Sequence, residues 1–267
     1  MPNKQLDAVY AAQIKAIRTR VQTFALARFN AGQYRDVNLG EFIKQVVPII
    51  AAGQKQVSSL TDSYLSMTLT SMLGTKVPMR GAIDTSNLRG IPLTDVYERP
   101  FVTVRTKLSQ GMPYDLAVQA GTARLVDLVS TDIQMAKTHT AQDVLSNSSE
   151  RVTGYERTLS GSKSCGLCVV ASTQRYHKED LMPIHPGCDC GVQPIIDRGV
   201  QVINPERLAE IHKSVGDFFG GNLDKSLQSS ARTPDYRKLI AVHEHGEIGP
   251  VLALKGQKFT SPSIINK

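Results

Sequence analysis

Residues 165–190 read CGLCVVASTQRYHKEDLMPIHPGCDC and contain all four cysteines of the 267-residue chain. Four cysteines confined to about a tenth of a chain are unlike a random scatter. The N-terminal residues are polar and lack the apolar core of a secretory signal, so the sequence predicts a reducing compartment. Clustered cysteines in such a compartment are typical of metal ligands rather than of disulfides.

The spacing of the cysteines and one histidine predicts a structural zinc site. The pair Cys165 and Cys168 is followed, after sixteen residues, by His185, Cys188 and Cys190. Two ligand pairs can close a tetrahedron once the chain turns back, and thiolates with an imidazole favour zinc. Five candidate ligands compete for four positions. Our first choice is Cys165, Cys168, His185 and Cys188, with Cys190 as the spare. The alternative second pair is Cys188 with Cys190. The alternative is four buried thiols that pack as small apolar groups, and thiol redox chemistry is less favoured.

The N-terminal half has the apolar periodicity of long helices. Apolar residues from Leu6 to Phe24 recur at spacings of three and four, which is one face of a helix. Such a face needs a cover, either the other helices of the chain or a partner protein. Four helices are predicted. The first ends at Asn30–Gly32, and the second runs from Asn38 to Gly74 with a kink or break at Pro48. The third runs from about Val96 to Gln110 and ends at Gly111, and the fourth starts at Pro113 and ends by Ser146.

The composition of the chain changes after residue 149: residues 150–200 are rich in glycine and contain short apolar runs. Before that point, residues 75–95 lack periodicity and are predicted to form an ordered loop. The apolar runs, at 167–171 and 192–196, predict short strands and knuckles. A helix is predicted from Asn204 to Gly220, and an extended tail after it. The resulting fold class is α+β, with a helical region at 1–149, a small domain with the Cys/His cluster at 150–221 and a C-terminal extension at 222–267.

The same cluster resembles the Mu F-like domain of phage minor head proteins. Tyr155-Glu156-Arg157, the C-G-L-C pair and the L-M-P-I-H-P-G-C-D-C end at 181–190 carry the resemblance. That family has cysteines followed by a proline-rich approach to His-Pro-x-Cys-x-Cys. The tail at 242–252 is similar to actinobacteriophage head proteins often labelled capsid maturation proteases. The chain departs from the family at Asp189, where Arg is common, and at Ala171-Ser172-Thr173, where an Asp-Gly pair is common.

The resemblance implies a minor capsid protein of a phage head. It would lie inside the capsid or at the portal vertex and occupy the host cytoplasm during assembly. Its implied partners are the portal protein and the major capsid or scaffold protein, with no small-molecule substrate. No apolar run reaches the roughly 18–20 residues that span a bilayer, so we expect no membrane partner.

Two other function classes are weighed against this one. A capsid maturation protease is the alternative, but the common metalloprotease needs His-Glu-x-x-His, and the chain has His243-Glu244-His245. On a strand these two histidines share one side, which is also compatible with a surface pair. The net charge of +7 permits contact with packaged DNA, yet acids are interspersed with the bases. We therefore favour a protein that is not an enzyme.

Overall fold

The computed structural model describes residues 4–31, 34, 36–159, 168, 171–172, 175–179, 190–196, 240–245 and 249–254. The chain divides into two compact units, Met1–Val144 and Leu145–Lys267. This division falls within the last turn of a long helix, and the predicted boundary at 221–222 lies outside the described residues. None of the described helices has the length and apolar character that crossing a membrane requires.

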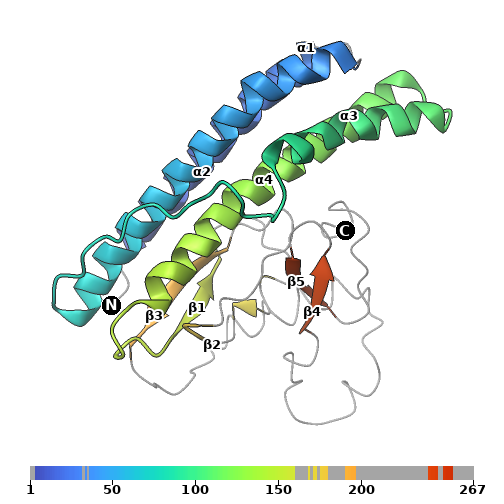
Figure 1. The fold of residues 1–267 in the computed structure, drawn as a ribbon. Helices are drawn as coiled ribbons and strands as arrows, with labels where there is room; N and C mark the ends of the chain where they lie inside the picture. Colours follow the sequence, from blue (N-terminus) through green and yellow to red (C-terminus); the bar gives the residue numbers. More distant parts are fainter. Residues whose placement is uncertain are drawn as a thin grey trace, which may run out of the picture. The chain divides into compact units, whose positions relative to one another are not determined.

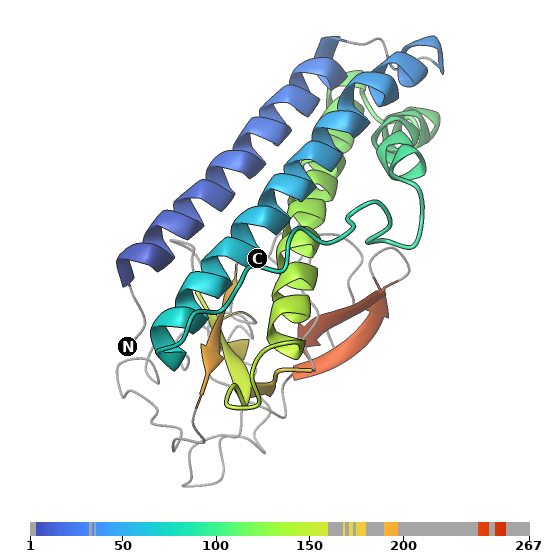
Figure 2. The same cartoon turned by 60° about the vertical axis from the view of Figure 1, so that its left-hand side comes forward.

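Four helices make up the first unit, as the sequence predicted (Figures 1 and 2). They are α1 (Lys4–Ala31), α2 (Asp36–Leu73), α3 (Leu93–Ser109) and α4 (Tyr114–Ser146). Helices α1 and α2 run side by side in opposite directions in both views. The α2 helix continues through Pro48, so of the two alternatives expected there, a kink or a break, the break is excluded. The expected glycine stop of α3 is confirmed: Gly111 has φ +80°, and its N–H donates to the carbonyl of Leu108.

The apolar face of α1 is covered by the chain's own helices. Tyr10 stacks on Tyr64 of α2 with ring centroids 4.0 Å apart, and Ile14 and Val21 are buried. At the other end of α1, Phe29 packs edge-on against Phe101 of α3 at 5.1 Å. The predicted stripe is not buried throughout: Leu6, Ile17 and Phe24 are half-buried and Val9 is exposed.

The segment between α2 and α3 is an extended chain that lies along α2 (Figure 2). Small polar side chains recur every fourth residue on that helix, so they share one face. Each of them bonds the extended backbone: Ser58 accepts from Ile83 N–H at 2.9 Å, Asp62 from Arg80 and Gly81, and Thr70 from Val77, while Ser66 donates to the Val77 carbonyl. This segment is the ordered loop that the sequence predicted at 75–95.

A buried ion pair joins the same segment to α4. Arg89 Nε lies 2.5 Å from Asp132 Oδ1, and both side chains are almost fully buried. The Tyr97 hydroxyl of α3 donates to the other carboxylate oxygen at 2.6 Å. Burial raises the pKa of Tyr97, and the neighbouring Asp132 carboxylate raises it further. The carboxylate therefore ties together the segment, α3 and α4.

Asp127 on α4 gives the helical unit a pH dependence. Burial raises the pKa of this carboxyl to about 6, and the nearby Arg124 opposes the shift. A carboxyl with a raised pKa binds more protons when folded, so its contribution to stability is full below its ordinary value of 3.8 and is lost as the pH rises to about 6. We expect Asp127→Asn to raise the free energy of unfolding at pH 7, because the neutral amide avoids the cost of burying a charged carboxylate. The gain should be only roughly 1 kcal/mol, since solvent screens this half-buried group, and it should be small at about pH 3. Urea unfolding at both pH values measures this, and equal stabilisation at both would contradict it.

The described residues of the second unit form two small antiparallel sheets. The first has the order β2-β1-β3, with β1 at Gly154–Thr158, β2 at Arg175–His177 and β3 at Gly191–Ile195. The second is the pair β4 (Ile240–His245) and β5 (Gly249–Leu254). The strand predicted at 192–196 is confirmed as β3. The strand predicted at 167–171 is wrong: Cys168 and Ala171 are helical, and Ser172 N–H donates to the Cys168 carbonyl as in a helical turn. The predicted helix from Asn204 lies outside the described residues.

Candidate metal centre

One face of the three-stranded sheet is buried and carries a mixture of aromatic and charged side chains. Alternate residues of a strand point to the same side, so Tyr155 and Arg157 of β1 share this face. Tyr155 pairs with Tyr176 of β2 and stacks on it with ring centroids 5.1 Å apart. Tyr155 is fully buried and Arg157 is 4% exposed. A charged residue at this position is unusual in a small core.

Cys190 belongs to the same face because of its place in the register. It directly precedes β3 and lies two residues before Val192, which pairs with Arg157. Residues two apart on an extended chain lie on the same side, so Cys190 and Arg157 are diagonal neighbours across two strands. The Cys190 side chain is a buried thiol, with the residue 6% exposed.

Cys168 reaches the same cluster from the helical turn. Its thiol is buried to the same extent as that of Cys190. The turn is fixed to the sheet because the Tyr176 hydroxyl donates a hydrogen bond to the Ala171 carbonyl at 2.8 Å. The Arg157 guanidinium lies 5.6 Å from the centroid of the Tyr176 ring. Tyr176 of β2 thus joins the turn to the sheet through the hydrogen bond of its hydroxyl.

The surroundings of Tyr176 shift the pKa of its hydroxyl. Burial raises the pKa of its hydroxyl to about 12. The positive charge of Arg157 and a hydrogen bond from it oppose the shift, whereas Cys190 and Cys168 add to it.

The donor chemistry of this cluster fits a zinc ion. Two buried cysteines beside one hydroxyl provide soft ligands away from water, as zinc prefers. The other three predicted ligands, Cys165, His185 and Cys188, lie outside the described residues. Within the described ranges no three His, Cys, Asp or Glu side chains gather closely enough to hold a metal. The site-residue prediction therefore stays a prediction for all five residues.

Arg157 and Tyr176 are the residues that sequence reasoning missed as parts of the site. The signal for Arg157 is its alternation with Tyr155, because an arginine two residues from a buried tyrosine of a strand shares its face. Nothing in the sequence marks Tyr176 as the residue that joins the turn to the sheet.

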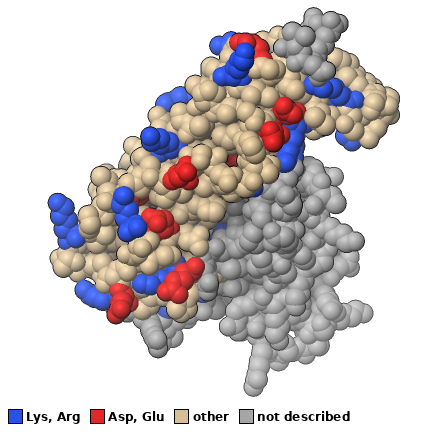
Figure 3. Space-filling model, viewed as in Figure 1, with Lys and Arg blue, Asp and Glu red and all other residues tan. Residues whose placement is uncertain are grey.

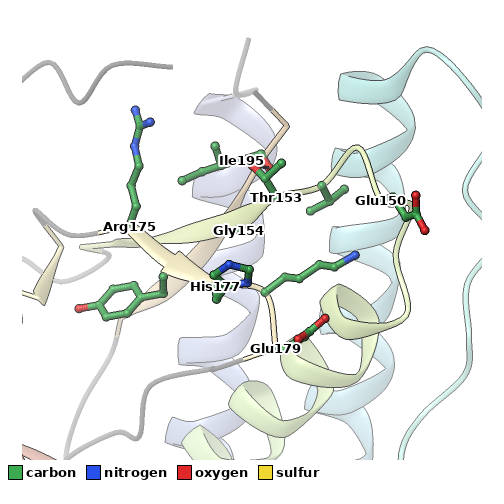
Figure 4. Close-up of a pocket in the computed structure, with 10 residues that line it drawn as sticks. Glu150, Thr153, Gly154, Arg175, His177, Glu179 and Ile195 are labelled. Carbon is green, nitrogen blue, oxygen red and sulfur yellow. Dashed lines mark hydrogen bonds between the residues drawn. The ribbon is translucent and has the colours of Figure 1, made fainter. Parts of the chain in front are cut away.

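The opposite face of the sheet borders a pocket of about 580 Å3 (Figure 4). His177 of β2, Glu179 in the turn after it and Glu150 before β1 lie around the pocket. Strand β2 pairs closely here because residue 154 is glycine: an added Cβ would lie 2.3 Å from the Tyr176 carbonyl oxygen. The lining contains acids and bases together, so its charge selects no single ligand class.

Two further predictions concern the histidine pair and the surface charge. His243 and His245 lie on β4, where they pair with Val251 and Gly249. On the face drawn in Figure 3, basic and acidic side chains of the helical unit are interspersed. This arrangement is typical of a solvated surface.

Comparisons with protein-family models, curated proteins and solved structures returned nothing that matches this chain.

Proposed function

We propose that the chain is a minor head protein of a phage, with a structural zinc site in its second unit. The observation that carries the proposal is that Cys168 and Cys190 are both buried in the second unit, Cys168 in the turn that Tyr176 bonds and Cys190 directly before β3. These two residues come from the opposite ends of the motif that resembles the Mu F-like domain. Two buried cysteines from the two halves of one motif support a ligand site.

The zinc ion would hold together a unit whose strands are short. Four side chains would bind the ion: Cys165, Cys168, His185 and either Cys188 or Cys190. Four protein ligands would leave no position open for a catalytic water. Strands of three and five residues bury little apolar surface, so a cross-link between the turn and β3 would stabilise the sheet strongly. The site is therefore proposed to be structural.

The four helices are proposed to dock the protein in the head. Their partners would be the portal protein and the major capsid or scaffold protein, as the sequence resemblance implies. The unit retains large apolar side chains on its surface around the turn between α3 and α4, such as Leu108, Tyr114 and Leu116. Packaged DNA is a further candidate partner, with weaker support because the charges in view are mixed.

Head incorporation tests this function. We expect the chain to be found in purified DNA-filled heads of the phage that encodes it, in few copies. Major capsid and scaffold proteins co-expressed with it should keep their masses. The Cys168→Ser variant should be absent from heads, whereas Ser172→Ala, a neighbouring change in the same turn, should be incorporated.

Two results would contradict the proposal. Absence of the wild-type chain from heads would exclude a virion component. Cleavage of the capsid or scaffold protein, lost when His177→Ala or His243→Ala is introduced, would replace the structural function with the maturation protease.

A further inference from the structure

Polar residues spaced by four positions form a ridge on α2, and this ridge binds the extended segment through its backbone. The α2 ridge consists of Gln54, Ser58, Asp62, Ser66 and Thr70. Ser58 and Thr70 each accept one backbone N–H of the segment, and Asp62 accepts two. Side chains of the segment are meanwhile exposed to solvent: Met79 is 63% exposed, and the side chain of Arg80 is 43% exposed. Backbone groups are common to all chains, so this recognition depends little on sequence.

The spacing of the α2 ridge matches that of an extended chain. Between Thr70 and Ser58 the helix rises about 18 Å, at 1.5 Å per residue. The residues that they bond, Val77 and Ile83, are six positions apart, which is about 20 Å in an extended chain. Every fourth residue of the helix therefore lies level with every second residue of the segment. An extended segment of another sequence can make the same bonds.

The α2 ridge continues beyond the point where the segment leaves it. Gln54 comes four residues before Ser58 and is 1% exposed, and its Oε1 accepts no hydrogen bond from the described residues. The segment turns after Ile83, where Ser86 N–H donates to Asp84 Oδ1 at 2.9 Å. A buried acceptor without a donor is energetically costly. A chain that stayed extended for two more residues would bring a backbone donor to the level of Gln54.

The segment is held in a way that favours local release. It begins at Gly74, where φ is +71°, and the buried ion pair of Arg89 with Asp132 fixes its other end. Between these points lies the ion pair Arg80–Asp143, which is exposed, and exposed pairs contribute little to stability. Stretches with exposed side chains and few buried apolar contacts are the ones that open locally while the helices stay folded.

We propose that the α2 ridge is a docking site for an extended segment of a partner protein, and that residues 77–83 occupy this site in the isolated chain. The partner would displace the chain's own segment, bond the ridge through its backbone and offer one further donor to Gln54. Asp62 is the strongest acceptor of the ridge, because hydrogen bonds to a charged group are stronger than neutral ones. The inference depends on neither the zinc site nor the function in the head, so its failure would leave both standing.

A synthetic peptide serves as the probe of this site. It has the sequence of residues 75–83 followed by three threonines, so that it stays extended where the chain's own segment turns. Its binding to the full chain is measured by fluorescence anisotropy. The double variant Arg80→Pro/Ile83→Pro removes two donors from the chain's own segment and leaves the ridge unchanged.

We expect the double variant to bind the peptide at least about tenfold more tightly than the wild type, because its site is free for a larger fraction of the time. Adding Asp62→Ala to the double variant should weaken binding about tenfold or more, since a charged acceptor is lost. Adding Glu41→Ala is the matched control, because Glu41 is an exposed carboxylate of α2 that bonds Gln45. This change should alter the affinity by less than about threefold.

Hydrogen exchange of the wild-type chain provides a second measurement, which decides if the double variant does not fold. An excess of the peptide should speed up exchange of the amides at 77–83, which lose their acceptors, and should leave exchange in α2 unchanged. Peptide that does not bind the folded double variant, or binds it no more tightly than the wild type, would overturn the docking site. Binding that survives Asp62→Ala, or exchange at 77–83 that the peptide does not change, would also overturn it.

Discussion

Removal of zinc by a chelator is expected to unfold residues 150–200 and to leave the four helices of the first unit folded. Structural zinc contributes on the order of 10 kcal/mol of apparent binding energy in small domains, which is comparable with the whole stability of a domain. The sheet has strands of three and five residues and cannot replace that contribution by burial of apolar surface. The helices have their own core, in which Phe29, Leu65 and Leu125 are fully buried.

Limited proteolysis with mass spectrometry measures this effect, and circular dichroism follows the helices in parallel. Chelator should create cleavage sites within 150–200, and excess zinc should remove them. Chelator that is already saturated with zinc is the control. An unchanged cleavage pattern would contradict the structural zinc site.

The same assay ranks the five candidate ligands. Our sequence ranking treats Cys190 as the spare, so Cys190→Ser should retain more zinc than Cys168→Ser. Zinc that is lost from Cys190→Ser but retained in Cys188→Ser would reverse that ranking. The equal burial of Cys168 and Cys190 makes this comparison informative.

Loss of the Asp132 carboxylate is expected to destabilise the helical unit by about 3–5 kcal/mol. Asp132→Ala leaves the buried guanidinium of Arg89 without its carboxylate, and removal of one partner of a buried pair typically has this cost. The Tyr97 hydroxyl also loses its acceptor. The segment between α2 and α3 would then lose its buried ion pair with α4.

The exposed pair Arg80–Asp143 provides the matched control. Its two side chains are 43% and 36% exposed, and the Nε–Oδ2 distance is 2.8 Å. Exposed pairs contribute about 0–1 kcal/mol, so Asp143→Ala should lower the free energy of unfolding by no more than that. Urea unfolding of the zinc-loaded chain, followed by the helical circular dichroism signal, compares the two variants. Similar losses in both would show that the buried pair has no special role.

The helices could be predicted from the sequence because their determinants are local. Apolar spacings of three and four and the glycine stop at Gly111 act within a few residues, and the structure reproduces them. The helix does not break at Pro48, because proline removes one backbone donor without forcing a helix to end. Its neighbours Val46 and Ile50 are fully buried, so packing holds the helix together across it.

The short apolar run at 167–171 shows the limit of periodicity. Five apolar or small residues fit either a strand or one turn of a helix, and the pattern cannot distinguish the two. The bond from Ser172 N–H to the Cys168 carbonyl and the contact of Ala171 with Tyr176 are made in the helical turn.

By itself, the sequence determined the four helices, the strand at β3 and the five residues that are candidates to hold a metal, because each depends on neighbours along the chain. Only the tertiary structure decided how the extended segment is held and where the buried charges meet. Arg89 and Asp132 are separated by 43 positions, and Arg157 lies opposite Val192 only through the register of β1 and β3. A buried charge is stabilised by a partner brought to it by folding, and no local pattern records which partner that is.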